Sequence, residues 1–409
     1  MENVFDLKYQ NELYFIFSST SEEKSIPEKE VAIILYLYYE DTVSKYLKYI
    51  DKIGKNINVY IVSPLDSVLL QVKKYAIKLG MENIYFLKKP NCGRDISGLL
   101  ITSKSIISSY KYVCFLHDKK AHTIDMEKDT EFWIKNIWGN LIADNNYIRQ
   151  VIDKFEQDNR IGILAPPAPV GEHFCTWYGY GWHGSFEVTQ KIAQRLDLDC
   201  DLDKNKPPIT IGTALWFRTK ALEKLFSYEW KYSDFEDKNL ARENYLSYGI
   251  ERIFAYVAQD AGFLTGEVMT SQYAQKQNLF LQYSMAEIFS YSQAYFPFPD
   301  LNSVRKLSDN LKRLLQSTAD KTVLLYGAGD MGRFCLNYLR KNEINAVAFV
   351  TTQENKDSNQ DGIPIIGVDD IKKYRDYKIV ITVAKREIQN EMIEELTKRG
   401  IQKYTIFWR

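Results

Sequence analysis

The sequence has no apolar run long enough to cross a membrane. The longest uninterrupted run, Val31 to Tyr39, has nine residues, about half of the ~20 that an α-helix needs to span a bilayer. The N-terminal stretch MENVFDLKYQNELYFIFSS carries acidic residues where a signal peptide would carry Lys or Arg. We therefore expect a cytoplasmic protein, and a position at the inner face of the membrane stays open.

A disulfide or zinc framework is also not expected. The cysteines are Cys92, Cys114, Cys175, Cys200 and Cys335. Their number is odd and none of them forms a CxxC pair, which is typical of a protein from a reducing compartment. The four histidines all lie between residues 117 and 183, and this clustering favours a functional region there.

Charge of one sign is not in excess. The 53 basic and 53 acidic residues cancel, and no lysine-rich tail is present. Binding to nucleic acid or to an anionic lipid surface therefore has no electrostatic support, and any basic site must be local.

What the sequence does have is length and a regular alternation of strand and helix patterns. Its 409 residues exceed one typical domain. From residue 30, short apolar runs alternate with helices of ten or more residues, a pattern typical of parallel strands covered on both faces. The first four strands are expected in VAIILYLYY, NVYIVS, NIYFLKKP and YVCFLHDKK. We predict an α/β fold with a mostly parallel sheet.

Three parts of the chain are expected. The first domain covers residues 1–275, a helical connector covers 276–319, and a small Rossmann-like α/β domain covers 320–409. The connector contains a Phe-Pro break in AYFPFPD. We expect its aromatic rings to pack one domain on the other, and contact with a membrane or a lipid-linked acceptor stays the alternative.

A charged segment, NCGRDISG, follows the third strand. Ligands of open parallel sheets lie at the carboxyl ends of the strands, where loops and helix N-termini meet. Gly93 would allow close backbone approach, Arg94 is suited to a phosphate or carboxylate, and Asp95 is suited to cap the next helix or to orient Arg94 or a sugar hydroxyl. The alternative is structural, with Asp95 only an N-cap and Arg94 its ion-pair partner.

The end of the fourth strand, FLHDKKAH, strengthens the functional interpretation. His117, Asp118, Lys119 and Lys120 leave a buried strand together, which is a poor structural motif but a suitable diphosphate site. Asp118 with His117 or His122 could instead hold Mg²⁺ or Mn²⁺, which would stabilise a departing phosphate oxygen. A single carboxylate offers few ligands for such an ion. The lysine side chains could equally stabilise the departing phosphate, and this alternative stays open.

These segments carry a family resemblance. NCGRDISGLL, YVCFLHDKKAH, IGILAPP, GTALWFR and GIERIFAYVAQDAG follow one another in order between Val31 and Val268. In this order they resemble the rhamnan synthesis protein F family of bacterial glycosyltransferases. The resemblance implies a GT-A-like fold and transfer of a sugar, in that family rhamnose from a dTDP donor, onto a growing surface polysaccharide.

The resemblance also bears on the metal. Members of the family often carry Thr or Ser at the position of Asp118, and related GT-A enzymes carry an Asp-x-Asp metal motif where this chain has His117, Asp118 and Lys119. This departure favours a site that uses its own cations.

Inverting sugar transfer needs a carboxylate that takes the proton from the acceptor hydroxyl. We predict Glu251 for this role, because it lies on a helix where the family pattern resembles the base-bearing helix of GT-A enzymes. The structural alternative is a surface Glu paired with an Arg at a neighbouring turn. Glu243 and Asp237 are the next candidates.

Acceptor contacts are expected from two aromatic segments. In GTALWFR, Trp216 is suited to stack on a sugar and Arg218 to hold a phosphate, although ALWF also fits a plain core strand. In EHFCTWYGYGWHG, the rings are expected to form a sugar-binding loop or lid, with a metal held by its two histidines as the alternative. The candidates in this loop are His173, Trp177, Tyr180, Trp182 and His183.

A glycine fingerprint opens the C-terminal domain. In GAGDMG, Gly327, Gly329 and Gly332 follow a strand and begin a helix, as in dinucleotide-binding domains. The next strand ends in Thr351 and Thr352, where an NAD site would place an acid for the ribose hydroxyls. We therefore do not expect NAD, and the domain either binds a nucleotide or serves packing or dimerisation.

The sequence thus predicts a glycosyltransferase with a nucleotide-sugar donor of the dTDP-rhamnose or UDP-hexose class. The acceptor is expected to be a glycan, with a lipid-linked form and peripheral membrane contact left open, as is a homo-oligomer. Two other functions stay open. One is an NAD(P)-dependent sugar oxidoreductase or epimerase that uses the C-terminal domain, and the other is a non-catalytic partner in polysaccharide assembly.

Overall fold

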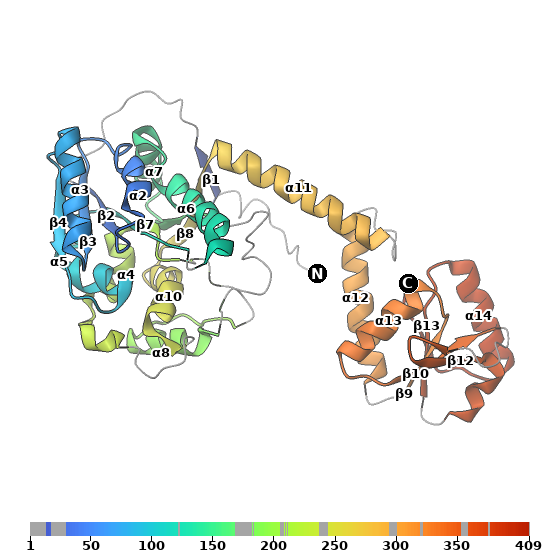
Figure 1. Ribbon diagram of the computed structural model, residues 1–409. Coiled ribbons are helices and arrows are strands. Elements are labelled where there is room, and N and C mark those ends of the chain that lie inside the picture. The colour runs from blue at the N-terminus through green and yellow to red at the C-terminus, as the bar shows by residue number, and fades with distance from the viewer. Residues whose placement is uncertain are drawn as a thin grey trace. The chain divides into compact units, whose positions relative to one another are not determined.

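A computed structural model describes the protein in two compact units, Met1–Phe280 and Leu281–Arg409 (Figure 1). The described residues are 14–17, 30–121, 123–167, 182, 184–204, 208, 210, 212–236, 244–293, 301–319, 322–352, 359–374 and 377–408. Each unit is an α/β layer structure built on its own sheet, so the predicted fold class is confirmed.

The sheet of the larger unit is mostly parallel. Its strands are β1 (Tyr14–Phe17), β2 (Val31–Tyr36), β3 (Asn58–Ser63), β4 (Ile84–Lys88), β5 (Tyr112–His117), β6 (Ile161–Ala165), β7 (Leu215–Arg218) and β8 (Leu264–Thr270). They lie in the order β1-β8-β6-β7-β5-β2-β3-β4. Only β7 runs antiparallel to its neighbours in this described sheet. Because of this reversal, the end of β7 pairs with the beginning of β5, at the edge opposite His117.

Helices cover both faces of this sheet, as Figure 1 shows. One face carries α2 (Val43–Ile50), α3 (Asp66–Leu79), α6 (Glu127–Leu141) and α7 (Asn145–Gln157). The other carries α4 (Arg94–Ser97), a π-helix (Gly98–Thr102), α5 (Lys104–Ile107), α8 (Phe186–Arg195), α9 (Glu223–Ser227), α10 (Leu246–Asp260) and the 3₁₀ helices η3 (Thr219–Leu222) and η4 (Tyr232–Phe235). A third 3₁₀ helix, η2 (Ile124–Met126), precedes α6.

Burial on both faces explains the uninterrupted apolar strands. In β2, Ile33 and Leu35 point into the core under α2 and α7, and Ile34 points into the core under α4 and α10. A strand with two apolar faces needs no alternating polar residues, which is typical of parallel sheets. The edge strand β1, which pairs in parallel with β8, was not predicted from the sequence.

Two helices follow this sheet in the chain. They are α11 (Ser271–Gln293) and α12 (Leu301–Thr318). In the described parts of the chain, no helix combines the length and the apolar character that a membrane crossing requires.

The smaller unit is a second mostly parallel sheet. Its strands are β9 (Thr322–Tyr326), β10 (Ala346–Thr351), β11 (Asn359–Gln360), β12 (Ile363–Gly367), β13 (Tyr377–Ile381) and β14 (Tyr404–Ile406), in the order β11-β12-β10-β9-β13-β14. Helices α12 and α13 (Asp330–Lys341) cover one face. The 3₁₀ helix η6 (Val368–Lys373) and α14 (Arg386–Lys398) cover the other.

Leu314 of α12 is buried together with Val323 and Phe407. The second helix of the predicted connector therefore contributes to the core of the smaller unit. The domain boundaries that the sequence places at residues 275 and 319 remain predictions.

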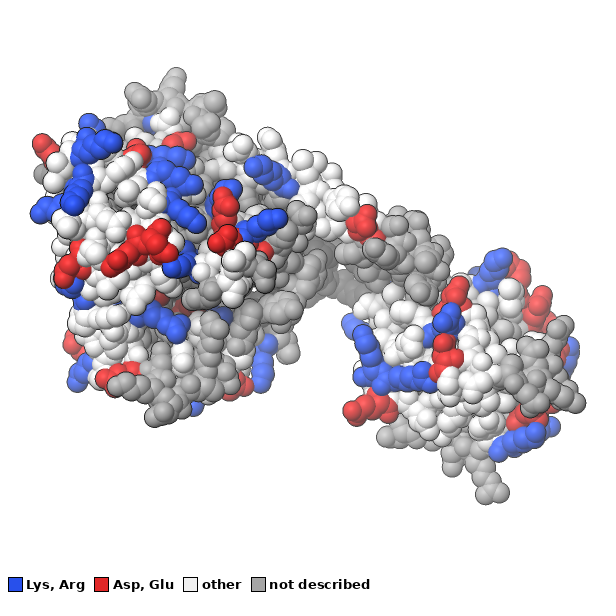
Figure 2. All heavy atoms as spheres, viewed as in Figure 1, with Lys and Arg blue, Asp and Glu red and all other residues white. Residues whose placement is uncertain are grey.

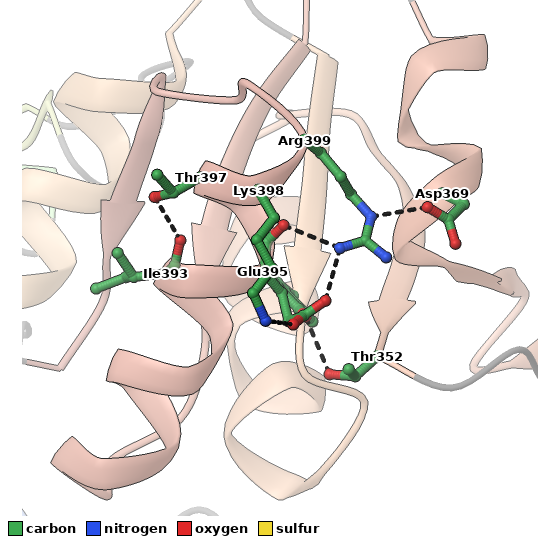
Figure 3. A network of polar contacts seen from close by, with 8 residues as sticks. Thr352, Asp369, Ile393, Glu395, Thr397, Lys398 and Arg399 are labelled. Atoms are coloured by element: carbon green, nitrogen blue, oxygen red, sulfur yellow. Dashed lines mark hydrogen bonds and ion pairs between the residues drawn. The ribbon is translucent and has the colours of Figure 1, made fainter.

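An ion-pair network joins the two helical elements on the second face of this sheet. Figure 3 shows Arg399 between Asp369 of η6 and Glu395 of α14, with Lys398 also paired to Glu395. Because water screens pairs at the surface, each of them contributes little to stability. The apolar residues beneath the network contribute more to the stability of the unit.

Candidate active site

The first part of the candidate site is the polar end of β5. Asp118 is only 4% exposed, and its Oδ2 accepts hydrogen bonds from the backbone amides of Tyr38 (2.7 Å) and Tyr39 (2.8 Å). Burial raises the pKa of the Asp118 carboxyl to about 6, although the two amide hydrogen bonds oppose this shift. Asp118 thus fixes the segment that leaves the neighbouring strand β2.

His117 and Lys119 surround an aromatic ring of α6. The His117 ring lies 5.2 Å from the Trp133 ring, and its Nδ1 donates to the carbonyl of Asp118 at 2.9 Å. Lys119 Nζ lies 4.5 Å from the centroid of the Trp133 ring, a cation–π contact. The backbone of Lys119 is fixed by the hydroxyl of Tyr46, which accepts from its amide and donates to its carbonyl.

Lys120 forms an ion pair with Asp41, and both side chains are substantially exposed. The roles of Lys119 and Lys120 in phosphate binding stay predictions.

The second part of the site is the loop after β4, which is held by a buried lysine. Lys89 is 3% exposed, and its Nζ donates to the carbonyls of Pro90 and Cys92, each at 2.8 Å. Burial lowers the pKa of Lys89 to about 8. Sequence analysis did not select Lys89, because a lysine at the end of a strand is usually exposed.

Gly93 and Arg94 both have left-handed backbones, with φ of 69° and 51°. A Cβ on Gly93 would lie 2.8 Å from the Cβ of Phe235 in η4. The glycine is therefore needed for close packing between two protein segments, which accounts for it without a ligand. For Arg94, a left-handed conformation is uncommon and marks a place where the surroundings dictate the backbone.

Arg94 connects this loop to α10. Its guanidinium lies 5.4 Å from the ring centroid of Tyr245 and 5.7 Å from that of Tyr248, and Nη1 donates to the Tyr248 hydroxyl at 3.3 Å. The N-cap of α4 is Gly93, with no side-chain capping bond. The prediction that Asp95 caps this helix is therefore wrong, and Asp95 lies in the first turn instead.

The third part of the site is Glu251 of α10. Its side chain is 18% exposed, Oε1 accepts from the Gly212 amide at 2.7 Å, and Oε2 lies 3.6 Å from Arg252 Nη1. Gly212 has a φ of 83°, and a Cβ there would lie 3.6 Å from Trp133 Cζ2. The backbone of Gly212, which Glu251 holds, therefore lies near Trp133, the ring that Lys119 also contacts.

Two acceptor contacts predicted from the sequence are wrong. Trp216 has 0% exposure, and its Nε1 donates to the carbonyl of Leu141. Arg218, the last residue of β7, is buried beside the start of β5. There it donates to the Tyr112 hydroxyl and the Phe155 carbonyl. Because β7 is antiparallel, Arg218 lies at the opposite edge of the sheet from His117. Both side chains serve the core.

The aromatic loop contributes one described candidate, Trp182. Its ring stacks on Tyr256 of α10 at 6.2 Å and meets Phe186 of α8 edge-on at 4.9 Å. Its role in sugar binding stays a prediction. Seven further candidates from the sequence lie outside the described residues: His122, His173, Trp177, Tyr180, His183, Asp237 and Glu243.

The described residues do not fit a metal held by the protein alone. Among them, no three His, Cys, Asp or Glu side chains come together. Asp118 already uses Oδ2 to accept two amide hydrogen bonds. The reaction proposed for this protein therefore does not depend on a metal ion.

In the smaller unit, the three glycines of the motif lie at the turn from β9 into α13. Gly327 has a φ of 118°, and a Cβ on Gly332 would overlap the carbonyl oxygen of Gly327, so helix and strand pack closely. A Cβ on Gly329 would meet no atom within 4 Å. At the end of β10, the hydroxyl of Thr352 bonds to the Tyr326 hydroxyl at 3.0 Å.

Charged side chains on the larger unit are interspersed rather than segregated. Figure 2 shows basic and acidic residues side by side over the face in view. This distribution fits the balanced composition and favours a local site over a broad electrostatic surface.

Two family models match this chain. The model of the family described as "Rhamnan synthesis protein F" matches residues 1–263, and that of "C2185-like, N-terminal" matches residues 319–407. The first match, together with the sheet topology, confirms the fold class predicted for the larger unit.

One curated relative is the redox-sensing transcriptional repressor Rex of Streptococcus mutans, 36% identical over 75 residues, which are 17% of this chain. The chain spans 35% of the length of that relative. Among solved structures, a mannosyltransferase from Pyrobaculum calidifontis in complex with GDP-Man and Mn²⁺ is 10% identical, with a TM-score of 0.26. That alignment covers 48% of this chain and 46% of the mannosyltransferase, and the TM-score is too low to support an argument.

Proposed function

The chain belongs to the rhamnan synthesis protein F family of polysaccharide synthesis, and from that premise we propose that it is a glycosyltransferase with a nucleoside diphosphate sugar as donor. The acceptor is a glycan. Support comes from the family match, which covers every strand of the larger sheet except β8.

The donor diphosphate binds where Arg94, His117 and Lys119 meet the carboxyl edge of the sheet. Arg94 reaches the start of α10, and Lys119 lies over Trp133. A cation beside the leaving diphosphate offsets the charge that develops as the glycosidic bond breaks. The sugar donor is of the dTDP-rhamnose or UDP-hexose class.

Glu251 is the general base. The Gly212 amide holds Oε1, so Oε2 is the oxygen that takes the proton from the acceptor hydroxyl. The acceptor oxygen then bonds to the anomeric carbon while the carbon–oxygen bond to the diphosphate breaks on the opposite face. This in-line arrangement inverts the anomeric configuration. The observation that carries the proposal is the hydrogen bond between Glu251 and the Gly212 amide, close to the Trp133 ring over which Lys119 lies.

The acceptor site, membrane association and oligomeric state predicted from the sequence are also proposals. Trp177, Trp182 and His183 bind the acceptor sugar, which is lipid-linked or free. Association with a membrane surface and formation of a homo-oligomer are further proposals.

The test is Glu251→Gln, assayed for transfer and nucleoside diphosphate release from dTDP-rhamnose and a panel of UDP-hexoses. We expect transfer to fall by about 10²–10⁴-fold, the usual contribution of a general base, with donor affinity retained. The matched control is Glu156→Gln, a carboxylate bonded to Tyr112 at the opposite sheet edge. Transfer at the wild-type rate by Glu251→Gln would rule out this role.

A second candidate function rests on the smaller unit. We propose that the turn at Gly327, Gly329 and Gly332 binds a nucleotide, because the close packing of Gly332 on Gly327 is what a dinucleotide fold requires. If it binds NAD(H), the protein is a sugar oxidoreductase or epimerase. Fluorescence titration with NADH distinguishes these functions, since tight binding with redox turnover belongs only to the second.

A further inference from the structure

The solvent side of helix α3 carries two exposed aliphatic side chains. Leu70 is 51% exposed and Ile77 is 70% exposed. They are seven residues apart, about two helical turns, so they lie on one line along the helix. The opposite side of the helix is buried through Val68, Val72 and Ala76. Single exposed aliphatic residues are ordinary on a protein surface, but two in line on one helix face suggest a contact surface.

Three lysines surround this line. Lys74 comes four residues after Leu70 and three before Ile77, so it lies between them on the same face, and Lys73 and Lys78 lie on either side. All three lysines are exposed, and within the described part of the chain none of them forms an ion pair or a hydrogen bond. We call these five residues the outer face of α3.

The acidic residues next to this face already have partners. Asp66, at the start of α3, forms an ion pair with Lys88 at 2.7 Å. Asp51, which follows α2, accepts a hydrogen bond from the Tyr75 hydroxyl of α3 at 2.5 Å. The outer face of α3 is therefore a local basic site on a chain whose 53 basic and 53 acidic residues cancel.

The composition of this face favours a lipid surface over a protein partner. Lysine is depleted at interfaces between proteins, which are enriched in Tyr, Trp and Arg. A surface of anionic lipid suits the outer face of α3 better, because flexible lysines can reach headgroup phosphates while aliphatic side chains enter the boundary of the acyl chains.

We propose that the outer face of α3 docks the protein on an anionic lipid bilayer. Lys73, Lys74 and Lys78 contact the headgroup phosphates, and Leu70 and Ile77 insert between the headgroups. The inference gives a surface to the membrane association proposed above, and it does not depend on the proposed glycosyltransferase activity.

The experiment is sedimentation of the full chain with two kinds of vesicle, one of phosphatidylglycerol and phosphatidylcholine in equal parts and one of phosphatidylcholine alone. The wild type should bind the anionic vesicles more strongly, and added salt should weaken this binding. In the variant Lys73→Gln with Lys74→Gln, binding to anionic vesicles should fall about 25-fold, because each lysine near such a surface strengthens binding about fivefold.

A second variant tests the aliphatic part of the face. Leu70→Gln with Ile77→Gln should lower binding by about tenfold, at high salt as well as at low salt, because apolar insertion is not screened by ions. Glutamine is a good helix former, and the substituted positions are exposed. Both double variants should therefore unfold at the temperature of the wild type.

The matched control is Lys191→Gln with Lys220→Gln. These exposed lysines belong to α8 and η3, which cover the other face of the sheet. The control changes the net charge by the same amount, so a docking surface confined to α3 predicts less than a twofold change in binding.

Several results would overturn the proposal. They are equal binding of the wild type to both kinds of vesicle or to neither, unchanged binding by the α3 variants, and an equal loss in the control. A wild-type dimer that becomes a monomer in Leu70→Gln with Ile77→Gln, seen by sedimentation velocity, would assign the face to contact between copies instead.

The proposed function is tested separately, by transfer to a soluble acceptor without vesicles. The α3 variants should transfer at the wild-type rate, because none of the substituted residues belongs to the candidate active site. A wild type that binds anionic vesicles through α3 but shows no transfer would contradict the proposed function and support the docking surface.

Discussion

At the scale of single residues, two neighbours in the chain can contact different partners at the edge of the sheet. Lys119 and Lys120 are neighbours in the chain. One lies over the Trp133 ring and the other pairs with exposed Asp41. Trp216 and Arg218 show the same point, because their chemistry suits a sugar site but their positions are in the core. The residue types of Trp216 and Arg218 therefore suggested a sugar site, but their buried positions assign both side chains to the core.

The two lysines give a matched pair of variants. Lys119→Ala should weaken binding of dTDP or UDP by about tenfold, since a hydrogen bond or contact to a charged group is worth about 1.5–3 kcal/mol. Lys120→Ala should change it less than about twofold, because the exposed Lys120 is already paired with Asp41 and its interactions are screened by water. Calorimetry at low and moderate salt measures both. Equal losses in the two variants would place Lys120 in the site after all.

At the scale of elements, α10 organises the site. It carries Glu251, receives Arg94 through Tyr248, and packs on α8 through Gly249. A Cβ on Gly249 would lie 3.2 Å from the backbone nitrogen of Thr189 and 2.5 Å from Ile192 Cδ1. The spacing between the two helices therefore depends on the absence of this one side chain.

Gly249→Ala should lower the free energy of unfolding by about 1–2 kcal/mol. Alanine gains up to about 1 kcal/mol of helix propensity, but overpacking costs about 1–3 kcal/mol, and the Thr189 backbone can yield only if α8 moves. Urea unfolding followed by circular dichroism measures the difference.

The control for this substitution is Gly139→Ala in α6. A Cβ on Gly139 would meet no atom within 4 Å, so the propensity gain should appear without a steric cost. A stabilised Gly249→Ala variant would show that α8 yields freely.

At the scale of the whole molecule, the chain is two α/β units that bury separate cores. The core of the smaller unit includes Leu314 of α12 together with Val323, Leu325 and Phe407. Residues 301–409 therefore contain both layers that cover the second sheet. A fragment that begins at residue 320, where the sequence places the domain boundary, would keep α13 but lack α12 on one face of the sheet.

We expect the fragment 301–409 to unfold cooperatively and the fragment 320–409 to be less stable by about 3 kcal/mol or more. Burial of one leucine side chain is worth about 1.5–3 kcal/mol, and α12 contributes Leu314 fully and Leu307 and Leu311 in part. Urea unfolding of the two fragments measures the difference. Equal stability would support the predicted boundary at residue 320.

The sequence by itself determined the α/β class, the positions of the first four predicted strands along the chain, the glycine motif of the smaller unit and the family. Each of these follows from local periodicity, or from motifs whose residues are close in the chain. The edge strand β1 escaped prediction, because its four residues make too short a pattern and its partner β8 lies about 250 residues away.

Only the tertiary structure decided which polar groups meet. The antiparallel direction of β7 removed Arg218 from the site, the packing of α10 on α4 brought Tyr248 and Arg94 together, and a hydrogen bond joined Glu251 to Gly212. These pairings join residues far apart in the chain, and their distances depend on strand direction and helix packing. Neither quantity is encoded in the local pattern of residue types.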